Sequence, residues 1–182
     1  MTFPPVVLQI ILVLLVVPAA VYDLRFRRIP NWLVLAGLLL GLGLNSFLFE
    51  WTGLRASLLG LGVGLLVYFP LYMLRGMGAG DVKLMAAVGS IVGWADWLGI
   101  FFLTALIGGV AAIALLVSRQ QLARGLSNVG YLLVEILCLR PPYARKEELD
   151  LGSPKSVKLP HGVVIAWGSV LFLGAAWIWA PR

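Results

Sequence analysis

Charged side chains are scarce in this sequence, since Asp, Glu, Lys and Arg together make up only 12% of its 182 residues. A typical soluble domain carries about 25%. Hydrophobic residues make up 61% of the chain, which is more than such a domain usually has. The shortage of charge therefore excludes an ordinary soluble protein and predicts an integral membrane protein.

Cysteine is almost absent, because Cys138 is the single example. One thiol cannot form an internal disulfide, and it cannot build a cysteine-rich metal site. We therefore expect no disulfide framework and no cysteine-rich metal site, and we assign no role to Cys138. We also predict that the protein uses no metal and no cofactor.

Strict alternation of apolar and polar residues, the pattern of a transmembrane barrel, is also missing. The apolar residues instead form repeated uncharged runs, and a helix needs about 20 such residues to cross a bilayer. The sequence predicts an all-α membrane protein, a polytopic bundle of about six transmembrane helices in a single domain over residues 1–182. The predicted spans are residues 5–22, 32–49, 54–74, 82–95, 97–117 and 160–180, of which the fourth is short for a full crossing.

Lys and Arg lie in short connections between the apolar runs rather than on one polar face, which argues against a nucleic-acid partner. All fourteen except Arg55 and Arg182 fall in connections that share one side of the predicted bundle. The positive-inside rule makes that side cytoplasmic and puts both termini outside. Because no Lys or Arg precedes the first apolar run, we expect an uncleaved span there and not a signal peptide.

Residues 118–159 form a more polar stretch of the chain. Apolar residues at helical spacing in its first half, with arginines at both ends, predict a helix that lies in the cytoplasmic interface of the lipid bilayer. A seventh crossing is the alternative, although Glu135 and the arginines leave its apolar core too short. The second half has the composition of a solvated loop.

Two acidic residues stand where predicted spans meet the cytoplasmic side. Asp23 ends the first span in VYDLRFRRIPN, and Asp81 begins the fourth in GAGDVKL. Each has an ordinary explanation, Asp81 as a helix N-cap and Asp23 as an anchor balanced by arginines. Because ionisable residues at membrane depth are costly and usually functional, their equal depth favours a shared site.

A pair of carboxyl groups can activate water. One, ionised, takes a proton from water while the other, protonated, polarises a carbonyl group, and within about 3 Å the two share one proton. Gly78 and Gly80 lack a Cβ and would let a substrate backbone approach. Lys83 is placed either to steady the ionised carboxylate or to extend to lipid headgroups.

Three motifs extend from Asp23 to Gly168: RRIPN after the first span, GMGAGDVKLMAAVG two spans later, and PHGVVIAWG at the start of the last span. With these motifs the chain resembles the type IV prepilin peptidases, membrane aspartic proteases with a GxGD motif. The resemblance implies a peptidase of the bacterial inner membrane. Such an enzyme cuts the basic cytoplasmic leader from prepilins or pilin-like proteins, with Asp23 and Asp81 as its catalytic pair.

Other residues in these motifs have two explanations each. Arg28, Pro30 and Asn31 in RRIPN either support the implied site structurally or simply form a positive interface and start the next helix. His161 stands where related chains often carry Tyr, and it either makes a local hydrogen bond or tunes proton affinity near the pair.

Larger members of that family carry an N-terminal cytoplasmic domain, often with paired CxxC motifs, that is associated with methylation of the new N-terminus. Here the first span begins almost at once and only one cysteine exists. We expect the compact form, without N-methylation, similar to the enzymes that serve tight-adherence (Flp-type) pili.

Two other classes of function are also compatible with the acidic pair. A proton-coupled transporter or channel subunit would relay protons through it, although transporters usually show internal repeats and midplane sites, and here both acids lie at the edge. An inert assembly protein would use both acids as caps, which leaves their equal depth unexplained. The sequence makes no prediction of the oligomeric state.

Overall fold

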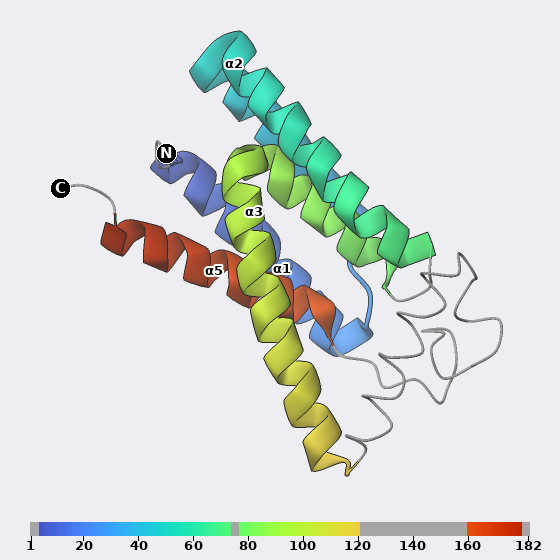
Figure 1. Cartoon of the computed structure of the whole chain (residues 1–182). Helices are drawn as coiled ribbons and strands as arrows, with labels where there is room; N and C mark the ends of the chain where they lie inside the picture. The colour runs from blue at the N-terminus through green and yellow to red at the C-terminus, as the bar shows by residue number, and fades with distance from the viewer. Residues whose placement is uncertain (1–3, 74–76, 121–159, 180–182) are drawn as a thin grey trace.

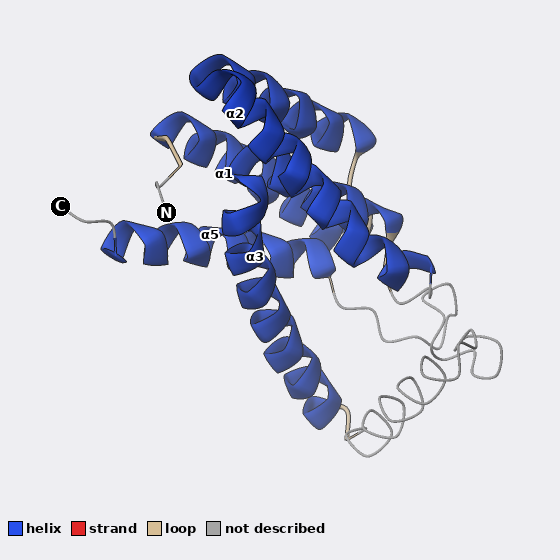
Figure 2. Cartoon of the chain, turned by 45° about the horizontal axis from the view of Figure 1, so that its top comes forward, coloured by secondary structure: helices blue, strands red, loops and turns tan. Residues whose placement is uncertain are grey.

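The computed structural model describes residues 4–73, 77–120 and 160–179, which form helices and short connections without a strand (Figure 2). The helices are α1 (Val6–Phe26), α2 (Asn31–Met73), α3 (Ala79–Ser118) and α5 (His161–Trp179). Each is long and apolar enough to cross a membrane. The prediction of an all-α membrane protein is confirmed, while the predicted interfacial helix and loop, apart from residues 118–120, lie outside the described residues.

Helix α1 runs one turn further than predicted and ends at Phe26. Its end is set by Arg27, which adopts the left-handed conformation with φ 53° and donates its backbone N–H to the carbonyl of Asp23. Asp23 therefore lies inside the last turn of α1 and does not terminate it. After a short connection, α2 begins directly behind Pro30, whose carbonyl accepts a backbone hydrogen bond from Val34.

Helix α2 folds back on itself at Glu50, where the backbone has φ 52° and ψ −133°. In a straight helix Gly41 and Gly60 would be about 28 Å apart. Both instead lie against one turn of α3, Gly41 beside Ser90 and Gly60 beside Gly89. The reversal occurs at the connection that the sequence predicts, and Figure 1 shows the two halves of α2 running alongside each other.

Helix α3 also reverses, since the indole N–H of Trp97 donates to the carbonyl of Met85 at 2.9 Å. Twelve residues of straight helix would span about 18 Å. The reversal lies at Gly93, with φ 77° and ψ 172°. The predicted spans 82–95 and 97–117 put this turn at residue 96, which is wrong by three residues. Gly93 makes the turn because L-residues with a side chain rarely adopt that backbone conformation.

Close contact between α2 and α3 holds the centre of the molecule together. The backbones of Gly60 and Gly89 approach so closely that a Cβ on either would overlap the carbonyl group of the other. Small residues allow such contacts between membrane helices. Helices α1 and α5 form a second contacting pair, and α5 also contacts α3. These contacts join all four helices around one buried core.

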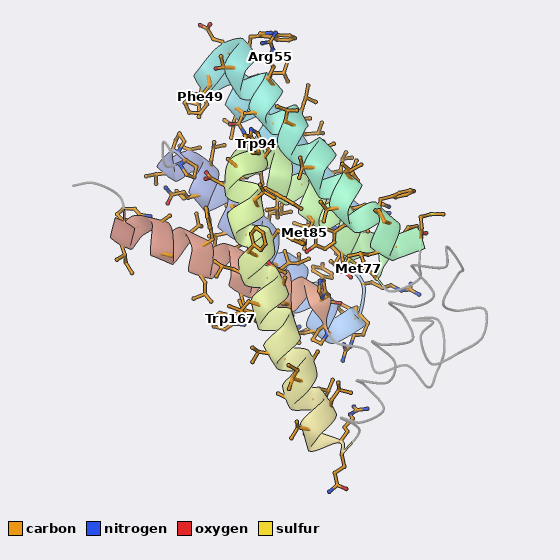
Figure 3. The ribbon with its side chains drawn as sticks, viewed as in Figure 1. Phe49, Arg55, Met77, Met85, Trp94 and Trp167 are labelled. Atoms are coloured by element: carbon orange, nitrogen blue, oxygen red, sulfur yellow. The ribbon has the colours of Figure 1, made fainter. Side chains whose placement is uncertain are left out.

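The two ends of the bundle are different. Figure 3 shows Phe49, Arg55 and Trp94 at the end where α2 and α3 reverse, and Met77 towards the opposite end. That opposite end holds the last turn of α1 and the first turns of α3 and α5 (Figure 1). Asp23 and Asp81 belong to those turns.

A buried amide ties the two reversing helices together. The side-chain N–H2 of Asn45 donates to three carbonyls, those of Gly41 at 3.0 Å, Ser90 at 3.0 Å and Ile91 at 2.9 Å. The hydroxyl of Ser57 donates to the same carbonyl of Ser90. The first half of α3 ends at Gly93, just after Ser90 and Ile91. Carbonyl groups in the last turn of a helix have no N–H donor within that helix, and Asn45 supplies the donor here.

Replacing Asn45 by Leu should destabilise the folded protein by about 1–3 kcal/mol, since buried carbonyls would lose their donor. The measurement is reversible unfolding in detergent micelles. Ser46→Ala is the matched control, because the Ser46 hydroxyl only donates to the Leu42 carbonyl within its own helix. Equal stability of Asn45→Leu and Ser46→Ala would contradict a stabilising role for the amide between the helices.

Candidate active site

Asp23 is buried at the contact between α1 and α5, with 8% of its surface exposed. One carboxylate oxygen, Oδ2, accepts a hydrogen bond of 2.9 Å from the backbone N–H of Gly162, which lies in the first turn of α5. The start of a helix carries free N–H groups and a partial positive charge, and both suit a carboxylate. The start of α5 therefore holds Asp23 in a defined position.

Gly162 allows this approach because it has no side chain. A Cβ at that position would lie 3.1 Å from both the Cβ and the Oδ2 of Asp23. Such a separation is tighter than ordinary van der Waals contact, about 3.5–4.0 Å between carbon atoms. Any larger residue would push the carboxylate or the start of α5 aside.

Asp81 is half-buried in the first turn of α3, which starts after Gly78. Its carboxyl group is close enough to that of Asp23 for the charge on one to act on the other. A Cβ on Gly78 would lie 3.2 Å from the Oδ2 of Asp81. The structure thus brings together the two acidic groups that the sequence analysis selects, although they come from helices far apart in the chain.

Two further polar side chains lie near this pair. His161, the first residue of α5, adjoins Gly162, which bonds to Asp23, and Tyr68 on α2 packs against His161. The rings of Tyr68 and His161 lie 6.5 Å apart. Two carboxyl groups, one imidazole and one phenol from the four described helices thus lie in the same region of the bundle.

This set of groups suits proton transfer. Carboxyl groups and imidazole are the usual general acids and bases of enzymes. Within the described ranges, no three His, Cys, Asp or Glu residues gather as potential metal ligands. Paired carboxyl groups are one arrangement that can activate water.

Comparison with known families shows which family the chain belongs to. The model of the type IV leader peptidase family matches residues 10–113, more than half of the chain. The chain belongs to the type IV leader peptidase family. The matched range contains both aspartates and Tyr68, whereas His161 and Gly162 follow it.

The curated proteins whose sequences are similar to this chain share the same name. The chain is 29% identical over 119 residues to a prepilin leader peptidase/N-methyltransferase of Myxococcus xanthus, an alignment that covers 62% of this chain and 35% of the relative. Proteins of the same name from Stutzerimonas stutzeri and Pseudomonas putida are 37% and 33% identical over 109 and 102 residues. These alignments cover 56% and 52% of this chain, and 36% and 35% of the relatives.

The chain therefore spans about a third of the length of these curated relatives. No solved structure matches it. The arrangement of the site in this family member is therefore given by the contacts of Asp23 and Asp81 described above.

Gly80 and Lys83 lie on α3 beside Asp81, but each faces a neighbour within the protein. A Cβ on Gly80 would lie 3.3 Å from the Cβ of Ile29, so this glycine lets the start of α3 approach the connection after α1. The ammonium group of Lys83 donates to Oδ1 of Asn31 at 3.1 Å. The opening to substrate expected at Gly80, and the steadying of a carboxylate by Lys83, stay predictions.

The remaining residues of RRIPN form the connection between α1 and α2. Arg28 is exposed and Pro30 is half-buried. Asn31 starts α2 and accepts the bond from Lys83. The connection is thus tied to α3 two residues beyond Asp81, and its expected supporting role stays a prediction.

Tyr68 and Gly162 are the parts of the site that the sequence analysis misses. Tyr68 lies in an apolar span among other aromatic residues, and nothing in its local pattern separates it from a lipid-facing tyrosine. Gly162 belongs to a motif that the analysis does identify, PHGVVIAWG, which is the one signal that could have found it. Its contact with Asp23 joins residues 139 positions apart.

Proposed function

We propose that this family member is an aspartic endopeptidase that removes the basic leader peptide from prepilins or pilin-like proteins. Asp23 and Asp81 are its catalytic residues, and it uses no metal or cofactor. The observation that carries the proposal is the placement of these two carboxyl groups at the same end of an apolar helix bundle, close enough for the charge on one to act on the other. Membership of the type IV leader peptidase family and the names of the curated relatives support it.

In the proposed reaction, the ionised carboxyl group takes a proton from a water molecule and the protonated one donates to the carbonyl oxygen of the scissile peptide. The water oxygen bonds to the carbonyl carbon and forms a tetrahedral intermediate. Proton transfer to the peptide nitrogen then lets the carbon–nitrogen bond break, which releases a new carboxyl group and a new amine. Both carboxyl groups recover their initial protonation, so the water is the only reagent consumed.

The proposed membrane arrangement has six crossings in one domain over residues 1–182. Two are α1 and α5, and four are the halves of α2 and α3 on either side of Glu50 and Gly93. Both termini lie outside the bacterial inner membrane, and residues 118–159 form a cytoplasmic interfacial helix and loop. The exposed arginines of the connection after α1 support a cytoplasmic location of the site under the positive-inside rule.

Cysteine labelling tests this topology. In a Cys138→Ser background, we expect a membrane-impermeant maleimide added outside the cell to label Thr52→Cys and not Arg28→Cys. Both positions are exposed, and the first half of α2 separates them. Labelling of Arg28→Cys from outside, with Thr52→Cys protected, would overturn the proposed orientation.

Cleavage by the purified protein tests the function. We expect the parent protein in liposomes to shorten a prepilin by its leader, scored on a gel and by mass spectrometry of the new N-terminus. A proton-coupled transporter is the second candidate, because paired intramembrane acids also relay protons. Proton flux into loaded liposomes without any cleavage would favour the transporter and reject the peptidase.

A further inference from the structure

A short connection, residues 27–30, joins the helix that carries Asp23 to the start of α2. The connection is bonded to Asp23 itself, because the backbone N–H of Arg27 donates to the Asp23 carbonyl at 2.9 Å. Even fully extended, the chain from Phe26 to Asn31 spans at most about 18 Å. The start of α2 therefore has to lie close to the turn that holds Asp23.

This connection has little conformational freedom. Arg27 adopts the left-handed conformation that ends α1, with φ 53°. The ring of Pro30 fixes its φ at about −65°, and the helical conformation is disfavoured for Ile29 because a proline follows it. The carbonyl of Pro30 accepts a backbone hydrogen bond of 3.4 Å from Val34 in the first turn of α2. Both ends of the connection are thus bonded to the helices that it joins.

The same part of the chain is attached to the helix that carries Asp81. Gly80 packs against the side chain of Ile29, since a Cβ on Gly80 would lie 3.3 Å from the Cβ of Ile29. The ammonium group of Lys83 donates to Oδ1 of Asn31 at 3.1 Å. These two contacts lie on either side of Asp81 in the sequence. They therefore hold the first turn of α3 against the connection between α1 and α2.

The two contacts restrain α3 in different ways. Apolar packing of Gly80 on Ile29 is non-directional, so it brings the elements together without fixing their register. A hydrogen bond has a preferred length and angle, and one from a charged donor is stronger than one between neutral groups. The bond between Lys83 and Asn31 is thus the directional part of the attachment.

We infer that Lys83 and Asn31 are positioning residues of the peptidase: the hydrogen bond between their side chains fixes the first turn of α3, and with it Asp81, relative to the connection that starts at Asp23. The inference rests on the proposed function and names the contact that sets the separation of the two acids. Gly162 holds Asp23 from the α5 side, and Lys83 holds the turn of Asp81 through Asn31.

Lys83→Met and Asn31→Leu test this role, because each removes one partner of the hydrogen bond and keeps a side chain of similar size. We expect each variant to lower kcat for prepilin cleavage about tenfold, the lower end of what one hydrogen bond to a charged group corresponds to, since both side chains are exposed. KM and the melting temperature should stay near the parent values, because substitutions of exposed residues change stability little.

Three further variants separate one shared bond from two independent effects. The double variant Lys83→Met/Asn31→Leu should be no slower than the slower single variant, because the bond can be lost only once. Asn31→Asp keeps an acceptor oxygen in the same place and should keep the kcat of the parent. Arg25→Met is the matched control, because it also removes an exposed cation, from the last turn of α1. It should leave kcat unchanged.

The outcomes decide between this role and a direct effect of the Lys83 charge on Asp81. A direct effect predicts that Lys83→Met slows cleavage and shifts its pH profile while Asn31→Leu cleaves at the parent rate, and that result overturns the inference. Parent rates in both single variants also overturn it, as do losses that multiply in the double variant, losses that follow a loss of fold, or a slow Asn31→Asp variant.

In each of these cases the proposed function stands as long as the parent cleaves and Asp23→Asn does not. Failure of the parent to cleave overturns both the proposed function and the positioning role.

Discussion

Asp23→Asn and Asp81→Asn should each lower prepilin cleavage by about 10²- to 10⁴-fold, the usual contribution of a general acid or base. An amide can neither take a proton from water nor share one with a neighbouring carboxyl group. The fold should survive in both variants. In the Asp23→Asn variant, the amide oxygen can still accept the bond that Gly162 donates.

Two comparisons make this result decisive. The double variant should be no slower than the slower single variant, because groups that act as a unit give strongly non-additive effects. Asp96→Asn is the control, since Asp96 is half-buried at the opposite end of the bundle, where α3 reverses. Initial rates and melting temperatures are measured for all four proteins and the parent. Cleavage within about tenfold of the parent rate by either single variant would contradict the proposed catalytic pair.

Gly162→Ala should lower kcat/KM by about 10- to 100-fold without unfolding the protein. The added Cβ would lie 3.1 Å from the carboxylate of Asp23, so Asp23 or the start of α5 must move by a few tenths of an ångström. Catalysis depends steeply on the position of reacting groups, and a misplacement of 1 Å can cost about 100-fold in rate. The change acts on the position of Asp23 and leaves its chemistry intact.

Gly174→Ala is the control on the same helix, because nothing lies within 4 Å of a Cβ there. It should keep full activity, and the better helix propensity of Ala should leave stability equal or slightly higher. Cleavage rates over a range of prepilin concentrations, with melting temperatures for both variants, check the pair. If Gly162→Ala cleaves as fast as Gly174→Ala, the hydrogen bond from Gly162 does not control the position of Asp23.

The fold is predicted well from sequence where local pattern decides it. Apolar runs with almost no charge indicate membrane helices, and the reversal of α2 at Glu50 lies where the predicted spans are interrupted. Two boundaries are wrong, since α1 continues past Asp23 and α3 reverses at Gly93 and not at Asp96. In both cases the error comes from using charge as the marker of a helix end. The backbone conformation of Arg27 and Gly93 sets those ends instead.

The sequence by itself determined the class of protein, the candidate acids and the family motifs, because composition and short motifs are local properties of the chain. Only the tertiary structure decided which groups surround those acids. The Gly162 N–H reaches Asp23 across 139 residues, and the ring of Tyr68 on α2 packs against Trp97 and Phe101 of α3 and His161 of α5. Such contacts depend on how helices pack, and helix packing is settled by complementary surfaces along whole helices, which no single stretch of sequence contains.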